Sequence, residues 1–237
     1  MITTKKVYKA LLIDLDDTIL SFSKAEEYAL KKLFLYYNIE INQNIIDLYK
    51  EINLKYWKKL EKKEITREDL LKQRFKEFFQ RINFSVSESD AYLANDIYFS
   101  YLTSKVFYIR KTVPALTKLK EKYQIYIITN GIKQVQTKRM KLATRLKGLY
   151  DGIFISEEIG TPKPSVEYMN QVLNKIGYKK EDILIIGDSL SSDMMLGINS
   201  CVDTCWFNVK KQKTDLKVTY DVANYKEVIE LLINSHS

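Results

Sequence analysis

The segment LLIDLDDTIL, residues 11–20, places three aspartates directly after an apolar run. Residues 7–15 are apolar enough to form a buried strand, and Asp14, Asp16 and Asp17 crowd together where that strand would end. Carboxylates are rarely buried unless they are paired with a cation or bound to a metal. The segment therefore predicts a buried strand whose carboxyl end needs positive charge nearby.

Residues 113–237 alternate short apolar runs with amphipathic stretches. The apolar runs QIYIIT, GIFIS, DILIIG and DTCWFN predict strands, and helical stretches separate them. This alternation favours a parallel sheet covered by helices on both faces. We therefore predict an α/β protein with a Rossmann-like, three-layer α/β/α core. The expected division is a core of residues 1–20 and 105–237 with an insert of residues 21–104.

The insert is expected to be a compact helical bundle. It contains no Gly or Pro between residues 23 and 104, and its apolar residues recur at helical spacing. Two pairs have the spacing of a capping box, which marks the start of a helix: Thr66 with Asp69 and Ser87 with Asp90.

Polar residues follow four of the expected strands. They are Asp14 and Asp16 after the first strand, Thr129 and Asn130 after QIYIIT, Lys163 in the loop after GIFIS, and Asp188 and Asp193 after DILIIG. The carboxyl ends of parallel strands meet at one edge of the sheet, where ligands bind. Carboxylate oxygens suit Mg²⁺, whereas Lys and Thr suit a phosphoryl group. The pattern predicts phosphoryl transfer through an aspartyl-phosphate beside Mg²⁺.

These segments resemble the four motifs of the haloacid-dehalogenase-like hydrolases, in the same order and at strand ends or adjacent loops. The matching residues are Asp14-x-Asp16-x-Thr18, Thr129, Lys163 followed by Pro164, and Gly187-Asp188 with Asp193. The resemblance covers essentially the whole chain, with the helical insert in the place of the first-position cap of that family. It implies a Mg²⁺-dependent hydrolase.

The resemblance also implies a division of labour among the aspartates. Asp14 would attack the phosphorus, and Asp16 would protonate the leaving oxygen and later take a proton from water. Mg²⁺ would be held by the carboxylates of Asp14 and Asp188 and by the backbone carbonyl of Asp16. Asp193 would orient metal-bound water or the lysine of the site.

Thr129, Asn130 and Lys163 would bind the transferring phosphoryl group. Each residue alone has a plainer interpretation, since Asp188 could cap a helix and Lys163 could be a surface lysine. Their joint occurrence favours the functional interpretation. Asp17 is the least expected to take part, because it lies on the opposite parity of an extended chain.

Phosphomonoester hydrolysis is the favoured reaction. Asp16 argues against a dehalogenase, which lacks an acid/base carboxylate at this position. The segments ITNG, ISEEIGTPKP and TCWFN are similar to the branch that contains the house-cleaning pyrimidine 5'-nucleotidases, so we expect a 5'-nucleotidase of pyrimidine nucleoside monophosphates. The alternatives are a phosphatase of another metabolite such as phosphoglycolate or a sugar phosphate, a β-phosphoglucomutase-like phosphomutase, and, more remotely, a phosphorylatable receiver-like module.

Selectivity for the substrate is expected to lie in the insert and its hinge. Phe22 follows the first motif closely and could stack on a nucleobase, as could Tyr56, Trp57 or Tyr92. Aromatic residues at helical spacing more often belong to a hydrophobic core, so Phe22 is the first of these candidates.

Composition narrows the class of protein further. The net charge is +8, but the lysines are dispersed among glutamates, so we expect a small-molecule substrate and no nucleic acid. No apolar run approaches the ~20 residues that span a bilayer, and no signal peptide is recognised. The single histidine, His236, is a poor candidate for catalysis. With two cysteines and no disulfide framework, we expect a cytoplasmic protein. We expect it to be a monomer or a homodimer.

Overall fold

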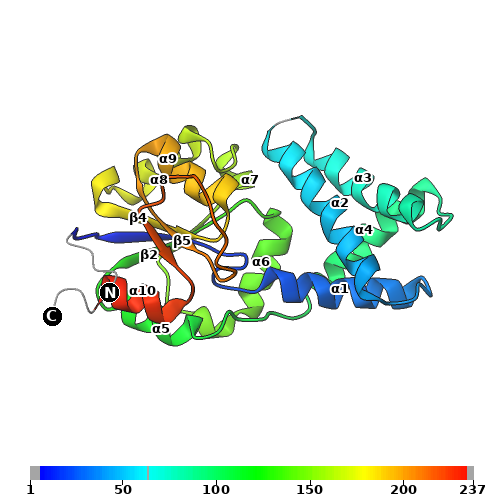
Figure 1. Ribbon diagram of the computed structural model, residues 1–237, viewed down its shortest axis with the longest axis horizontal. Helices are drawn as coiled ribbons and strands as arrows, with labels where there is room; N and C mark the ends of the chain where they lie inside the picture. Colours follow the sequence, from blue (N-terminus) through cyan, green and yellow to red (C-terminus); the bar gives the residue numbers. More distant parts are fainter. Residues whose placement is uncertain (1–5, 63, 234–237) are drawn as a thin grey trace. The chain divides into compact units, whose positions relative to one another are not determined.

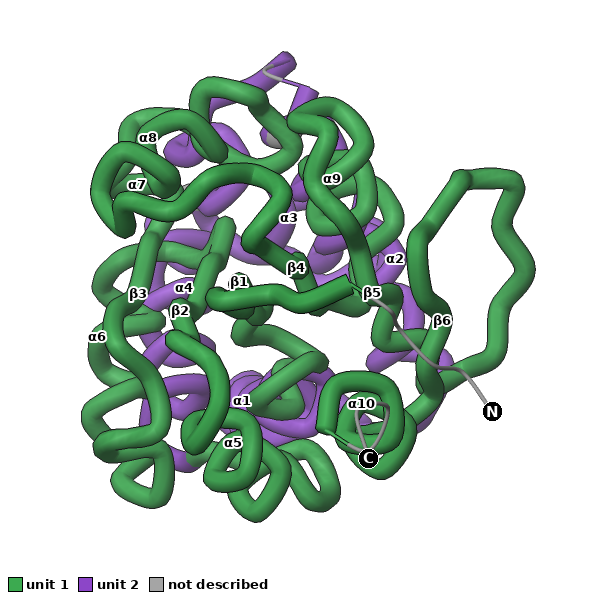
Figure 2. Tube along the Cα trace, turned by 90° about the vertical axis from the view of Figure 1, so that its left-hand side faces the viewer, with its two compact units in different colours: residues 1–22, 106–237 green, residues 23–105 purple. Residues whose placement is uncertain are grey.

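The computed structural model describes residues 6–62 and 64–233, so His236 lies outside the described residues. The chain divides into two compact units (Figure 2). Unit 1 comprises residues 1–22 and 106–237, and unit 2 comprises residues 23–105. Within the described part of the chain, every helix is too short or too polar to cross a bilayer.

Unit 1 is built on a parallel sheet. Its strands are β1 (Ala10–Asp14), β2 (Gln124–Thr129), β3 (Gly152–Ile155), β4 (Ile183–Gly187), β5 (Asp203–Phe207) and β6 (Tyr220–Val222). Their order across the sheet is β3-β2-β1-β4-β5-β6, and every neighbouring pair is parallel. The predicted parallel sheet is confirmed. The sequence did not predict β6, which is short and has the mixed composition YDV.

β1 lies between β2 and β4 and is buried along its whole length. Leu12 pairs with Tyr126 of β2 and with Ile185 of β4. After β1 the chain builds the sheet outward to β3 and then returns to the other side of β1 to form β4. Such a reversal of strand order beside one strand creates a crevice at the carboxyl ends, where ligands bind in open α/β sheets.

Helices cover both faces of this sheet (Figure 1). The helices of unit 1 are α5 (Thr112–Lys120), α6 (Lys133–Leu142), α7 (Ser156–Ile159), α8 (Val166–Ile176), α9 (Met195–Ser200) and α10 (Tyr225–Leu232), with the short turns η1 (Thr144–Leu146), η2 (Lys180–Asp182) and η3 (Leu190–Met194). Leu11 and Ile13 of β1 pack in a cluster with α5 and α10, whereas Leu12 packs with α8 and α9. The alternation confirms the three-layer core.

Unit 2 is helical, as the sequence predicted. Its helices are α1 (Phe22–Tyr36), α2 (Gln43–Glu61), α3 (Arg67–Arg81) and α4 (Glu88–Leu102). Both predicted capping boxes are present: Thr66 with Asp69 starts α3, and Ser87 with Asp90 starts α4. Contacting aromatic rings fill the interior, contributed by Phe34, Tyr49, Phe75, Phe78, Phe79 and Tyr98.

A buried polar network crosses this aromatic interior. The Arg74 guanidinium donates to Oδ1 of Asn53 at 3.0 Å and to Oδ1 of Asn95 at 2.7 Å. Asn53 in turn donates to Glu26 at 2.9 Å, and all four side chains are buried. The network links α1, α2, α3 and α4, because each helix contributes one of these residues.

Candidate active site

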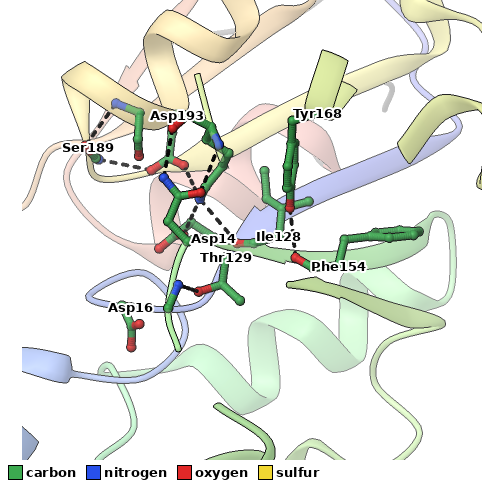
Figure 3. Close-up of polar contacts among 12 residues, drawn as sticks. Asp14, Asp16, Ile128, Thr129, Phe154, Tyr168, Ser189 and Asp193 are labelled. Atoms are coloured by element: carbon green, nitrogen blue, oxygen red, sulfur yellow. Dashed lines mark hydrogen bonds and ion pairs between the residues drawn. The ribbon is translucent and has the colours of Figure 1, made fainter. Parts of the chain in front are cut away.

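Asp14, labelled in Figure 3, is the last residue of β1, and its carboxylate forms an ion pair with Lys163. Lys163 Nζ lies 2.6 Å from Oδ1 of Asp14 and 2.7 Å from Oδ1 of Asp193. The ammonium also donates to the carbonyl of Ile128 at 3.3 Å, and only 1% of the lysine side chain is exposed. One buried cation therefore serves two buried carboxylates.

Burial and neighbouring charges shift the pKa values of Asp14 and Lys163. Burial raises the pKa of Asp14 well above its usual value, although the charge of Lys163 opposes this shift. Burial alone would lower the pKa of Lys163, but the charges of Asp14 and Asp193 outweigh it and raise the pKa. Lys163 is thus held as a cation, suited to binding an anion and unsuited to releasing a proton.

Asp188 adds a third carboxylate to the cluster. One carboxylate oxygen from each of Asp14, Asp188 and Asp193 lies within 4.8 Å of the others. Burial, followed by the charges of Asp193 and Asp17, raises the pKa of Asp188 to about 8. Hard oxygen donors with surplus negative charge fit Mg²⁺. The contribution expected from the backbone carbonyl of Asp16 stays a prediction.

Asp193 is held in place by the turn that follows β4. Its Oδ1 accepts from Lys163, and its Oδ2 accepts from the backbone N–H of Ser189 at 3.2 Å. A Cβ at Gly187 would overlap the Asp193 carboxylate, so the glycine leaves room for this close approach. The structure therefore places Asp193 against the lysine, which is one of the two positions that the sequence analysis proposed for it.

Asn130 and Lys163 are joined by two reciprocal hydrogen bonds. Nδ2 of Asn130 donates to the Lys163 carbonyl at 2.9 Å, and the Lys163 N–H donates to Oδ1 of Asn130, also at 2.9 Å. The Asn130 amide thus anchors the loop that delivers the lysine. Its expected contact with a phosphoryl group stays a prediction.

The Thr129 hydroxyl, at the end of β2, accepts hydrogen bonds but donates to none of the described residues. Oγ1 accepts from Nε2 of Gln136 at 3.0 Å and from the Gly131 N–H at 3.1 Å. A hydroxyl has two acceptor lone pairs and one donor hydrogen. With both lone pairs engaged, Thr129 can present its hydrogen to an oxygen anion, and its expected contact with a phosphoryl group stays a prediction.

Asp16 lies on the loop after β1, separate from the ion-pair cluster in Figure 3. Its carboxylate is held by two side chains of α6 that the sequence analysis did not identify, Gln136 and Arg139. Their spacing of three residues places them on one helix face, but the segment KQVQTKRMKL looks like an ordinary basic surface helix. Asp17 has a left-handed backbone, with φ of 55°.

The candidate specificity residues lie in different environments. Phe22 is half-buried, and its ring centroid lies 5.6 Å from the guanidinium carbon of Arg139. Within unit 2, Tyr56 is buried and donates to Glu77 at 2.9 Å, whereas Trp57 is half-buried and Tyr92 is exposed. The burial of Tyr56 is what a core residue would show.

Comparisons with known proteins agree with the fold. A family model described as haloacid dehalogenase-like hydrolase matches residues 8–200, and the chain belongs to that family of hydrolases. It is 34% identical to the HAD-hydrolase YfnB of Bacillus subtilis over 96% of both chains. It is also 34% identical to the pyrimidine 5'-nucleotidase PynA of Streptococcus pneumoniae over 95% of both chains.

Two further comparisons extend this result. The pyrimidine 5'-nucleotidase YjjG of Escherichia coli is 26% identical, with 94% of this chain and 96% of that protein covered. A crystal structure of Bacillus subtilis YfnB bound to magnesium matches with a TM-score of 0.88 at 32% identity, covering 96% of this chain and 100% of that one. The family resemblance drawn from the motifs is thereby confirmed.

Proposed function

We propose that this hydrolase is a Mg²⁺-dependent 5'-nucleotidase that cleaves pyrimidine nucleoside monophosphates through a phosphorylated Asp14. The observation that carries the proposal is the buried Asp14–Lys163 pair at the end of β1, with the carboxylate of Asp188 close by. This arrangement combines a nucleophilic oxygen, a fixed cation and a set of hard metal ligands.

In the first half-reaction, the free carboxylate oxygen of Asp14 attacks the phosphorus in line with the ester oxygen. The new O–P bond forms as the P–O bond to the nucleoside breaks, and Asp16 donates a proton to the departing oxygen. The Lys163 ammonium and the Thr129 hydroxyl bind the phosphoryl oxygens. Mg²⁺ held by Asp14 and Asp188 would neutralise charge on the phosphoryl group.

In the second half-reaction, the acyl phosphate on Asp14 is hydrolysed. Asp16, now ionised, takes a proton from water, and the water oxygen attacks the phosphorus. The bond between the phosphorus and Asp14 breaks, which releases inorganic phosphate and regenerates the carboxylate. Asp16 thus serves first as acid and then as base, so it ends the cycle protonated as it began.

The nucleotide is favoured as substrate by the extent of the similarities. The two relatives named as pyrimidine 5'-nucleotidases are matched over 94–96% of each chain. The glyceraldehyde 3-phosphate phosphatases of Methanothermobacter thermautotrophicus and Methanopyrus kandleri are matched over less of this chain, 50% and 78%, at 25% and 24% identity. Similarity that extends through the helical unit supports a shared substrate class, because that unit is the expected source of specificity.

A phosphatase screen tests the proposal. Phosphate release is measured with Mg²⁺ on UMP, dUMP and dTMP, and compared with phosphoglycolate and hexose phosphates, with Asp14→Asn as the inactive control. We expect the highest kcat/KM on a pyrimidine nucleotide and no turnover by the variant. A sugar phosphate or phosphoglycolate as the best substrate would contradict the nucleotidase assignment, and full activity of Asp14→Asn would contradict the mechanism.

A further inference from the structure

We infer that Arg139 and Gln136 of α6 are positioning residues, which hold the Asp16 carboxylate in the orientation needed for proton transfer. The inference rests on the proposed function, since it concerns the acid/base step of that reaction. It assigns a role to two buried side chains that the chemistry at Asp14 and Lys163 does not use.

Both oxygens of Asp16 are engaged by this pair. Nη1 of Arg139 lies 2.5 Å from Oδ1 of Asp16, and Nε2 of Gln136 lies 2.6 Å from Oδ2. The Asp16 side chain is 27% exposed and belongs to a loop, whereas the Arg139 side chain is 1% exposed on a helix. A partly exposed carboxylate without such partners would sample several rotamers. Two bonds from a rigid helix restrict it to one.

Gln136 connects this carboxylate to the phosphate-binding residue Thr129. The same Nε2 that donates to Asp16 also donates to Oγ1 of Thr129 at 3.0 Å. Arg139 fixes the orientation of this amide, because Nη1 of Arg139 donates to Oε1 of Gln136 at 2.8 Å. The acid/base carboxylate and the phosphate-binding hydroxyl are therefore held relative to one another by a single amide group.

The turn before α6 leaves room for the side-chain amide of Gln136. A Cβ at Gly131 would overlap the side chain of Gln136, so any other residue there would displace it. A buried arginine is costly unless its charge is compensated, and removal of either partner of such a pair is strongly unfavourable. Nε of Arg139 has no hydrogen-bond partner among the described residues. The guanidinium therefore leaves one buried donor unpaired while Nη1 donates to Asp16 and Gln136.

A leaving-group comparison separates positioning from a purely structural role. A nucleoside 5'-oxygen is a poor leaving group and needs a proton from Asp16, whereas p-nitrophenolate leaves without one. We measure kcat/KM for UMP and for p-nitrophenyl phosphate, which reports only the steps up to the first phosphoryl transfer. For Arg139→Ala we expect a loss on the order of 100-fold on UMP and no more than about threefold on the aryl ester.

The second half-reaction gives an independent readout. Asp16 must take a proton from water to hydrolyse the acyl phosphate on Asp14, so a misoriented Asp16 lets this intermediate accumulate. Arg139→Ala should therefore release a burst of p-nitrophenolate of about one equivalent per site before slow turnover. Arg139→Lys, which keeps the charge and one donor but loses the planar fork, should recover part of the UMP activity.

A control variant on the same helix and two fallback variants complete the test. Lys138→Ala removes a cation from the exposed side of the same helix and should leave both substrates unaffected. If Arg139→Ala does not fold, Gln136→Ala and Arg139→Lys carry the same comparison. Equal losses on UMP and p-nitrophenyl phosphate, without a burst, would overturn the inference. If the wild type prefers another alkyl phosphate, the nucleotide assignment fails, and that ester replaces UMP in the same test.

Discussion

At the scale of single residues, the charge of Lys163 holds the candidate active site together. The ammonium is buried between Asp14 and Asp193, 2.6 and 2.7 Å from their nearest oxygens. Its two partners keep it protonated, as the raised pKa of Lys163 indicates. In the absence of substrate it limits repulsion between carboxylates, and the same charge is available to the oxygens of a phosphoryl group.

Lys163→Ala is expected to lower kcat/KM for nucleotide hydrolysis by at least about 100-fold, because a buried cation aimed at the reacting group is lost. It also leaves Asp14 and Asp193 without their shared counter-ion, so the protein should be less stable. Steady-state kinetics with thermal unfolding distinguishes the two effects. Lys175→Ala, on α8, is a control for loss of a lysine, and loss of activity in that variant too would indicate a nonspecific charge effect.

Asp17 should be far less sensitive to substitution than Asp14 or Asp16. Its backbone is left-handed, with φ of 55°, a conformation that asparagine tolerates well. Its side chain accepts from Ser21 at 3.3 Å, within the loop. Asp17→Asn is therefore expected to change kcat/KM by no more than about threefold, whereas Asp16→Asn should lower it by at least about 100-fold on UMP. Similar losses in both variants would contradict this division of roles.

At the scale of secondary-structure elements, helix capping makes the stability of unit 2 depend on pH. Asp69 accepts from the side chain and backbone of Thr66, and Asp90 accepts in the same way from Ser87. These hydrogen bonds lower the pKa of both carboxyls below the usual 3.8. The stabilisation is therefore fully present above about pH 4 and is lost as the pH falls through the lowered values.

Removing both carboxylates should flatten the acid limb of the stability profile. Asp69→Asn/Asp90→Asn is expected to unfold at a lower temperature than the wild type at pH 7, with the difference shrinking as the pH approaches 2. Circular dichroism melts across this range measure it. Asp96→Asn, at an exposed position within α4, provides the control. A gap that stays constant with pH would show that capping charge is not its source.

The buried arginine of unit 2 makes a second prediction at this scale. Arg74 donates to Asn53 and Asn95 and stacks on Tyr98 with its guanidinium carbon 5.1 Å from the ring centroid. Arg74→Ala would leave both amide oxygens without this donor and should cost about 2–4 kcal/mol of unfolding free energy. Urea unfolding measures the loss, with Lys76→Ala on the exposed side of α3 as control. A cost below about 0.5 kcal/mol would contradict it.

The sequence predicted the elements that have strong local signals. Apolar runs identify β1, β2 and β4, and the capping boxes identify the starts of α3 and α4. β6 has only three residues, too few to show a strand pattern in the sequence, and it forms by pairing with β5. The sequence did not predict the hydrogen bonds from Arg139 and Gln136 to Asp16, because they join residues 120 or more positions apart and leave no local pattern.

At the scale of the whole molecule, the sheet topology brings together charged side chains that are far apart in the sequence. Asp14 and Lys163 are separated by 149 positions, and Lys163 and Asp193 by 30. The motifs predicted these residues because parallel strands deliver their carboxyl ends to one edge of the sheet. The pairing of β1 with both β2 and β4 then places Asp14 at the centre of that edge.

Because these charged side chains lie close together, we expect the stability of the protein to depend on divalent cations. Three carboxylates and one lysine converge on this edge, so without a metal the site carries excess negative charge. Mg²⁺ that binds only the folded protein stabilises it by about 2.7 kcal/mol at 100 times its Kd. We expect the unfolding temperature of the wild type to rise with Mg²⁺ in a saturable manner.

Asp188→Asn should change both the stability without metal and the stabilisation by Mg²⁺. Without metal and above about pH 8, where the Asp188 carboxyl is ionised, the variant should unfold at a higher temperature than the wild type, because it lacks this partly buried negative charge. With Mg²⁺ it should gain little, because a ligand has been lost. Asp215→Asn, an exposed aspartate elsewhere in unit 1, should respond to Mg²⁺ as the wild type does. An equal Mg²⁺ response in all three proteins would show that the metal does not bind at Asp188.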